Sequence, residues 1–242
     1  MSPEVEKFLN KEGWEQEIRH KVTNDEFEEL LIQNKGNFSS FKKAWTKIGG
    51  TNSETVFELL IEQHQKPKRK YHNITHVSYM LQGFKNACSK IPYNETIEIA
   101  IWFHDAIYDP LKEDNEEQSA ELAYNQCILN NIEEKIANNI KQLIMATKHG
   151  LIKPKNTEEK IIADLDLAVL GLDFQTFKKY GKAIKEEFTI INEKEYNKIQ
   201  LKMLNDFLKQ KELFHTEYFK NKYEKQARQN LKQAIEETIT NS

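Results

Sequence analysis

The sequence predicts an all-α protein. Apolar side chains recur at the three- and four-residue spacing of amphipathic helices along nearly the whole chain, whereas the alternation of a half-buried strand is hard to find. The 242 residues include only eight glycines and five prolines, the residue types that most often interrupt helices. A chain of this length is expected to form one large domain, or one domain with a modest extension.

The first helices are placed by their start signals and apolar faces. A Ser-Pro-Glu start predicts a helix over 2–21, with serine as the cap and proline at the first helical position. A second amphipathic helix is expected over 24–34, stopping at Gly36, and a third over 38–48. These segments hold no cluster of histidine, aspartate or cysteine, so we interpret them as packing elements or as a partner surface.

The later helices are expected between capping residues, glycines and prolines. Polar caps satisfy the free backbone N–H groups at a helix start, and glycine commonly ends a helix. By these signals, helices are predicted from a Ser53 cap, from an Asn73 cap, from Ile97, and over 114–130, 132–150, 157–171, 173–190, 192–213 and 216–240. The lysine-rich outer faces of the last three are interpreted as solvated surface.

The composition argues against several broad classes. The formal net charge is only −3, with 30% charged residues, and no basic excess points to a nucleic-acid partner. Cys88 and Cys127 match no zinc spacing and no disulfide framework, which suits a reducing cytoplasm. No apolar run approaches the ~18 residues of a membrane span, and the polar, acidic start is unlike a signal peptide. We therefore expect a cytoplasmic protein without membrane or nucleic-acid partners.

The stretch Ile97–Pro110, read IEIAIWFHDAIYDP, carries the first candidate functional pair. A helix there places His104 on an apolar stripe, with Asp105 beside it near the helix end. An ionised carboxylate buried without a partner is costly, so a positive group should meet it. A divalent metal would satisfy both side chains, because imidazole nitrogen and carboxylate oxygen are ordinary metal ligands. The alternative interpretation is a core histidine followed by a helix-end aspartate.

Two further histidines lie in the segment RKYHNITH. Pro67 ends the preceding helix, and if Asn73 caps the next one, His76 lies in its first turn and His72 just outside it. Two histidines four residues apart can bind one metal together. They can also divide the work, one as a ligand and the other as a free acid.

Asp164 and Asp166 lie in an otherwise apolar helix. Asp166 has apolar neighbours one turn away on both sides, whereas Asp164 has Lys160 at i−4 as a surface partner. Asp166 is therefore the expected inward carboxylate, and Asp164 stays as the alternative. Together with His76, His104 and Asp105, this aspartate completes a set of two imidazoles and two carboxylates on three separate helices. Such a set favours a shared metal ion over unrelated core residues.

The order His76, then His104-Asp105, then Asp166 resembles the H…HD…D signature of the HD superfamily of metal-dependent phosphohydrolases. This superfamily has an all-helical fold. The chain is most similar to a bacterial family of predicted HD-type phosphohydrolases, through RKYHNITH, WFHDAIYDP, DNEEQSA, ATKHG, DLAVLG and ARQNL. The resemblance covers roughly residues 40–235. It implies an HD-type domain over 41–242 and an N-terminal helical extension over 1–40. The implied metal ligands are His76, His104, Asp105 and Asp166, or Asp164 in place of Asp166.

YHNITH also resembles the YHNxxH signature of cyclic-nucleotide phosphodiesterases, which share this type of helical metal site. In those enzymes the first histidine donates a proton to the leaving oxygen, and the second binds metal. The resemblance therefore implies that His72 is a general acid and that His76 is a ligand. Nothing else in the chain resembles the phosphodiesterase nucleotide pocket, so cyclic-nucleotide specificity does not follow.

Hydrolysis of a phosphoester at such a site needs further groups. Asp109 is a candidate to orient the attacking water, and Glu117 is a second candidate unless it is only a capping-box residue. The candidate phosphate contacts are Arg69, Lys148, His149 and Arg228. The ligand set suits manganese, iron, nickel, zinc or magnesium, and Asp105 is placed to bridge a second ion.

The expected function is therefore metal-dependent hydrolysis of a small, nucleotide-like phosphoester. One alternative is a sensor or interaction module that binds metal or nucleotide without turnover. Another is a di-iron oxygenase on the same scaffold. The expected partner is a small phosphorylated substrate, and a homodimer is left open.

Overall fold

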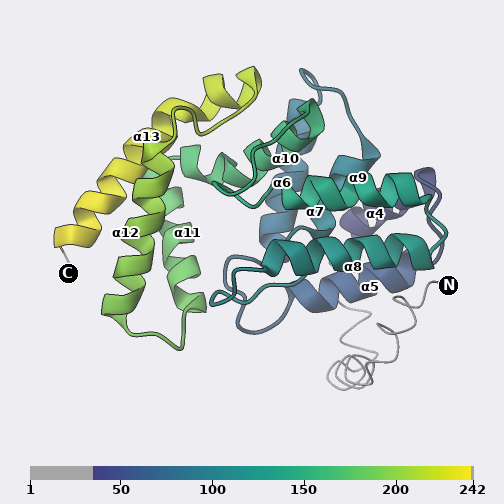
Figure 1. The fold of residues 1–242 in the computed structure, drawn as a ribbon, viewed down its shortest axis with the longest axis horizontal. Helices are drawn as coiled ribbons and strands as arrows, with labels where there is room; N and C mark the ends of the chain where they lie inside the picture. The colour runs from purple at the N-terminus through teal and green to yellow at the C-terminus, as the bar shows by residue number, and fades with distance from the viewer. Residues whose placement is uncertain (1–34, 241–242) are drawn as a thin grey trace.

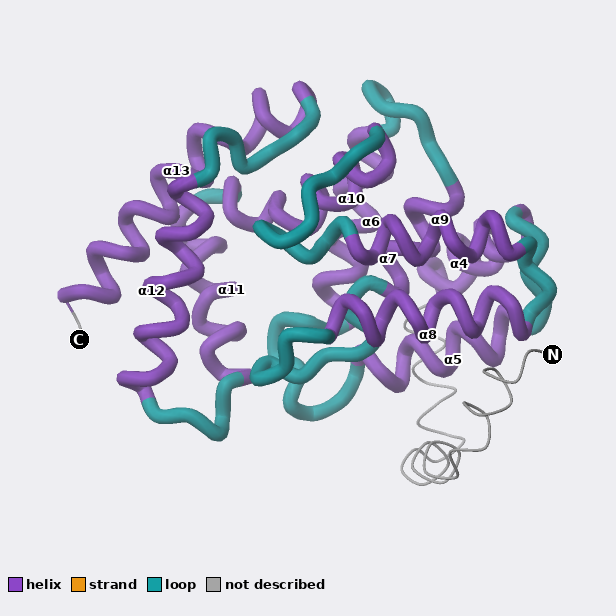
Figure 2. Tube along the Cα trace, viewed as in Figure 1, coloured by secondary structure: helices purple, strands orange, loops and turns teal. Residues whose placement is uncertain are grey.

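The computed structural model describes residues 35–240, and every regular element in that range is a helix. Figure 2 shows these helices joined by loops, without a strand in the described part. The predicted all-α class is confirmed. In chain order the elements are α4 (Lys35–Lys47), α5 (Ser53–His64), α6 (Ile74–Ala87), α7 (Glu95–Phe103), α8 (Asn115–Leu129), α9 (Glu134–Met145), α10 (Thr157–Leu167), the 3-10 helix η1 (Ala168–Gly171), α11 (Phe174–Glu187), α12 (Glu193–Lys209) and α13 (Glu217–Thr240).

The chain is described from α4 onward, so the helices predicted over 2–21 and 24–34 lie outside the described residues. Gly36 is itself helical, and the boundary predicted between residues 40 and 41 falls inside α4. Phe41 and Trp45 of this helix are fully buried. Helix α4 therefore contributes directly to the core of the protein.

Helix α7 runs through the middle of this core. Every residue from Thr96 to Phe103 is buried, and α4, α6, α8, α9 and α10 pack around it. A helix that is apolar on nearly all sides requires such a complete enclosure. His104 follows directly as the C-cap, with its backbone N–H bonded to the Ala100 carbonyl. The His104-Asp105 pair therefore lies at the end of the most enclosed helix.

Helix α10 and its continuation η1 connect two groups of helices (Figure 1). Helix α10 packs on α6, α7 and α9, while η1 packs on α11 and α13. At Gly171 the backbone of η1 touches Tyr223 of α13, where an added Cβ would lie 2.4 Å from the tyrosine Cβ. Glycine is therefore needed at this close approach.

The helix starts follow the sequence signals in part. The Asn73 side chain accepts a hydrogen bond from the Thr75 N–H at 2.8 Å, so the predicted cap of α6 is confirmed. Asn52, not Ser53, precedes α5, and its backbone lies in the left-handed region. The predicted capping box at the start of α8 is wrong, because Asp114 makes no side-chain cap and Glu117 pairs with Lys148 instead.

Two other sequence expectations concern the whole chain. Cys88 and Cys127 are free thiols, consistent with the absence of a disulfide framework. Among the helices of residues 35–240, none combines the length and the apolar character needed to cross a bilayer.

Candidate metal centre

Three side chains from three helices converge at the ends of α7 and α10. His76 comes from the first turn of α6, His104 caps α7, and Asp166 lies in the last turn of α10. Their ligand atoms all lie within 4.8 Å of one another. The His76 Nε2 atom lies 3.2 Å from His104 Nε2 and 3.1 Å from a carboxylate oxygen of Asp166. This group is able to hold a metal ion.

Asp105 borders the same group. Its carboxylate lies 3.1 Å from His104 Nε2 and 3.8 Å from His76 Nε2. The side chains of Asp105 and Asp166 are each less than one-fifth exposed, and both histidines are buried. The four predicted ligands therefore lie together, with their acids at the more open side.

The hydrogen bonds of His104 set its tautomer. Its Nδ1 lies 2.8 Å from the carbonyl oxygen of Ile101, which can only accept a hydrogen bond. Nδ1 therefore carries the proton, and in the neutral ring the lone pair of Nε2 faces the other three side chains. A metal-bound histidine uses this arrangement, with one nitrogen on the ion and the other N–H on a carbonyl.

The charges of the group also favour a cation. Burial raises the carboxylate pKa values, but the facing histidines outweigh it and hold the pKa values of Asp105 and Asp166 below their usual range. Burial lowers the pKa of His104, yet the Asp105 carboxylate more than reverses this and raises it to about 9. Two ionised carboxylates thus attract one positive charge, which a proton or a metal ion would supply.

The structure gives Asp164 and Asp166 different roles, but the difference is not that Asp164 lies at the surface. Asp164 was expected to face the surface, but it is fully buried. Its carboxylate accepts hydrogen bonds from the N–H groups of His215 and Thr216 and from the Thr216 hydroxyl, at 2.7–2.8 Å. Asp164 therefore anchors the start of α13, and Asp166 is the member of the metal group.

His149 and Lys148, predicted as phosphate contacts, differ in their surroundings. His149 Nε2 lies 2.7 Å from the second carboxylate oxygen of Asp166, so it borders the group directly. The ammonium of Lys148 contacts the Glu113 carbonyl and the Glu117 carboxylate at the start of α8. Lys148 therefore ties two loops together beside the site.

The two predicted arginines are engaged with backbone carbonyls. The buried Arg69 guanidinium donates to the carbonyls of His72, Asp105 and Ala106. Arg228 donates to Glu224 and to the carbonyls of residues 208, 210 and 211, between α12 and α13. Arg69 holds the backbone that carries Asp105 through these hydrogen bonds.

The two predicted water-orienting acids, Asp109 and Glu117, each make a contact with a nearby residue. The Asp109 carboxylate accepts a hydrogen bond from the Leu111 N–H within its own turn. Glu117 is exposed, whereas its neighbour Glu116 is half-buried. Burial raises the pKa of Glu116, and the Asp105 charge raises it further. The Asp105 charge therefore acts on Glu116, the more buried of the two neighbouring acids.

A carboxylate that the sequence analysis missed lies beside His72. Glu187, at the end of α11, accepts hydrogen bonds from the backbone N–H groups of residues 70, 71 and 72 at 2.7–3.0 Å. Its second oxygen lies 2.6 Å from His72 Nδ1, and the ring of Tyr108 stacks on His72 at 3.9 Å. Glu187 follows Tyr180 and Ala183 at helical spacing. This spacing along one face of α11 is the sequence signal that could have predicted Glu187 as an inward-facing acid.

Comparisons with protein-family models, with curated proteins and with solved structures found no match to this chain.

Proposed function

We propose that this protein is a metal-dependent phosphohydrolase of the HD type that acts on a small phosphoester. The observation that carries the proposal is the convergence of His76, His104 and Asp166, which are distant in the sequence, within 4.8 Å of one another. The His72–Glu187 pair beside this group supports an acid–base role, because hydrolysis of an ester needs a proton for the leaving oxygen.

The donor set fits a divalent ion. Two imidazole nitrogens and two carboxylates are compatible with manganese, iron, nickel, zinc or magnesium, and Asp105 is a candidate to bridge a second ion. A bound ion would supply Lewis acidity and would lower the pKa of a bound water. Arg69 would act indirectly, since it fixes the carbonyls of Asp105 and Ala106 and thereby the approach of the Asp105 carboxylate.

In this proposal His72 moves the proton. The pKa of Glu187 is lowered, because the hydrogen bonds and charge of His72 outweigh the effect of burial, so the carboxylate is ionised and only accepts hydrogen bonds. The His72 Nδ1 atom must then carry a proton. This leaves Nε2 as the atom that would exchange a proton with the leaving oxygen.

The direct test pairs elemental analysis with a substrate panel. Protein purified without chelators would be analysed for bound metal and then assayed on phosphoesters with added manganese, magnesium or nickel. We expect the variant His104→Ala to lose both the metal and hydrolysis. His215→Ala is the matched control, because the His215 ring is exposed and outside the group, and it should retain both.

Three outcomes would replace the proposal. Hydrolysis at the wild-type rate by metal-free His104→Ala would exclude a metal-dependent mechanism. If no ester were cleaved while one nucleotide raised the melting temperature specifically, the protein would be a sensor. Iron in the purified protein together with oxygen consumption would instead indicate an oxygenase.

A further inference from the structure

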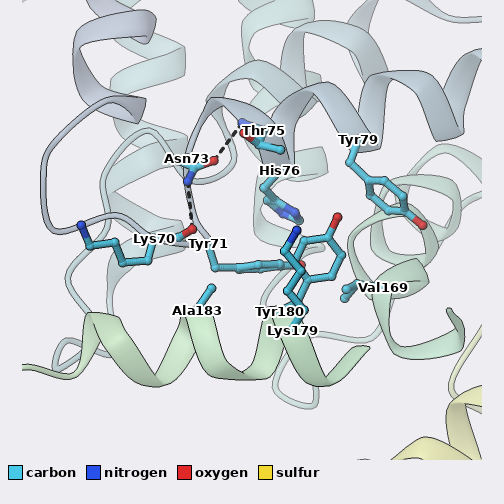
Figure 3. A pocket seen from close by; sticks show the side chains of 10 residues that line it. All are labelled: Lys70, Tyr71, Asn73, Thr75, His76, Tyr79, Val169, Lys179, Tyr180 and Ala183. Atoms are coloured by element: carbon cyan, nitrogen blue, oxygen red, sulfur yellow. Dashed lines mark hydrogen bonds between the residues drawn. The ribbon is translucent and has the colours of Figure 1, made fainter. Parts of the chain in front are cut away.

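A cavity of about 210 Å³ lies beside the metal group, between α6 and α11 (Figure 3). Lys179 and Tyr180 extend from α11 toward α6, and Ala183 faces the same space one turn later. The described lining residues are Lys70, Tyr71, Asn73, Thr75, His76, Tyr79, Val169, Lys179, Tyr180 and Ala183. The residues of this wall combine tyrosines, small apolar groups and two lysines, and none of them is an acid.

His76 belongs to both the cavity and the metal group. Its Nε2 faces His104 and Asp166, and its ring lies 4.8 Å from the Tyr71 ring that forms the adjoining wall. The hydrogen bonds of the described residues to the His76 ring involve Nε2, and the other nitrogen, Nδ1, is not among the enclosed side-chain atoms that lack a partner, so it is open to a group in the cavity. A histidine that binds metal through one nitrogen usually donates its second N–H to an acceptor. A ligand or water in the cavity would provide that acceptor.

The composition of the wall indicates the chemistry of the occupant. Aromatic rings and apolar groups favour a flat apolar part, since rings stack or pack edge to face on tyrosine. In Figure 3 Lys179 extends into the space whereas Lys70 runs away from it, and because the lining holds no acid the Lys179 ammonium favours a negative charge. The volume is below the 300–1,000 Å³ that is typical for pockets of drug-sized ligands, so it suits a single ring better than a large molecule.

We propose that this cavity receives the organic part of the substrate, and that the substrate is a phosphoester carrying one aromatic ring. This inference rests on the proposed function for the reaction, but the binding preference can be measured without turnover. The ring would lie among Tyr71, Tyr79 and Tyr180, and Lys179 would attract the phosphoryl group toward the His76 side of the cavity.

The experiment compares two non-hydrolysable probes, phenylphosphonate and methylphosphonate, on the full manganese-loaded chain by isothermal titration calorimetry. Wild-type protein should bind phenylphosphonate more tightly by a factor of roughly 10 to 100, the value of burying one aromatic ring. Ala183→Leu places a larger side chain in the cavity and should reduce this preference to less than about threefold, with the metal content unchanged.

Lys179→Met and Lys182→Met form the matched pair for the charge. Both lysines are exposed on α11, but only Lys179 lines the cavity. Lys179→Met should weaken both phosphonates by about threefold to tenfold, and less so in high salt, whereas Lys182→Met should have no effect. Because both changes are at the surface, this arm remains informative if Ala183→Leu fails to fold.

The outcomes separate this inference from the function. A phenyl preference that is abolished by Ala183→Leu supports the cavity, even if phenyl phosphate is never hydrolysed and the proposed reaction is wrong. Hydrolysis of phenyl phosphate with the same phenyl preference in wild-type and Ala183→Leu proteins would overturn the cavity assignment while leaving the function intact. Equal binding of the two phosphonates by the wild-type protein would also overturn it.

Discussion

The imidazole Nδ1 of His72 lies 2.6 Å from a carboxylate oxygen of Glu187, a residue 115 positions later in the chain. The other carboxylate oxygen of Glu187 accepts three consecutive backbone N–H groups at the start of the same segment. One acid thus fixes both the backbone that leads to His72 and the orientation of its ring. This arrangement is what a histidine that donates a proton requires.

The first prediction concerns this pair. The amide oxygen of Glu187→Gln can still accept the backbone N–H groups, but its NH₂ group cannot accept from His72 Nδ1. We expect kcat for an alkyl phosphate to fall by about tenfold to a hundredfold, and kcat for p-nitrophenyl phosphate to fall by less than about threefold, because a good leaving group needs little protonation. Steady-state kinetics on the two esters would measure the difference.

The control for that experiment is Glu186→Gln, which changes the exposed neighbour on the same helix. His72→Ala should reproduce the dependence on the leaving group and retain the bound metal. If both esters slowed equally in Glu187→Gln, the acid would have only a structural role. Loss of metal from His72→Ala would identify His72 as a ligand.

The second prediction distinguishes the two aspartates of α10. Asp166→Ala removes a member of the metal group, so bound metal should fall to a small fraction of the wild-type content while the protein still folds. Asp164→Ala leaves the N–H groups of His215 and Thr216 without an acceptor and should lower the free energy of unfolding by about 2–4 kcal/mol. Its metal content should remain that of the wild-type protein. Metal loss confined to Asp164→Ala would reverse the assignment.

The third prediction compares the two arginines. Arg69→Met and Arg228→Met each remove several hydrogen bonds from a guanidinium to backbone carbonyls, so each should cost about 2–4 kcal/mol of stability. Only Arg69 holds the carbonyls of Asp105 and Ala106, so only Arg69→Met should also weaken metal binding, by about tenfold or more. Titration of the metal-free proteins with manganese would measure the affinities. An increase in KM alone, with normal metal affinity, would instead indicate direct phosphate contact by Arg69.

The fourth prediction concerns acid stability. His64 is fully buried, with Nε2 3.0 Å from the Trp102 carbonyl, and burial together with the nearby Arg69 charge lowers its pKa to about 3. Between about pH 6.5 and 3, the unfolded chain binds a proton here that the folded chain does not bind. The neutral His64 ring therefore makes its full contribution to the free energy of unfolding above about pH 6.5. This contribution decreases as the pH falls toward 3, by at most about 1.4 kcal/mol per pH unit.

His64→Gln cannot titrate in this range but can still donate to the Trp102 carbonyl. Its loss of stability between pH 7 and pH 5 should therefore be smaller than that of the wild-type protein, by about 1–2 kcal/mol. Urea unfolding of metal-free protein at the two pH values would measure the difference. Identical pH dependence in the two proteins would show that other groups control acid unfolding.

The sequence predicted the helices and three of the grouped residues well because their signals are local. The helical spacing of apolar residues identified α7 as buried, and Asn73 identified the start of α6. A histidine or aspartate on such a face has to meet a polar partner, which made His76, His104 and Asp166 recognisable. The starts of α5 and α8 were less accurate, since several adjacent polar residues can cap the same helix.

The sequence alone therefore determined that this chain is helical and that a few polar side chains face its interior. Only the tertiary structure decided how those side chains pair. Asp164 is as buried as any core residue, yet it anchors α13 by hydrogen bonds to residues more than 50 positions away. Glu187 and Arg69 were likewise assigned by contacts with distant backbone. Burial follows from the pattern along one helix, whereas a hydrogen-bond partner depends on which other helix packs against it.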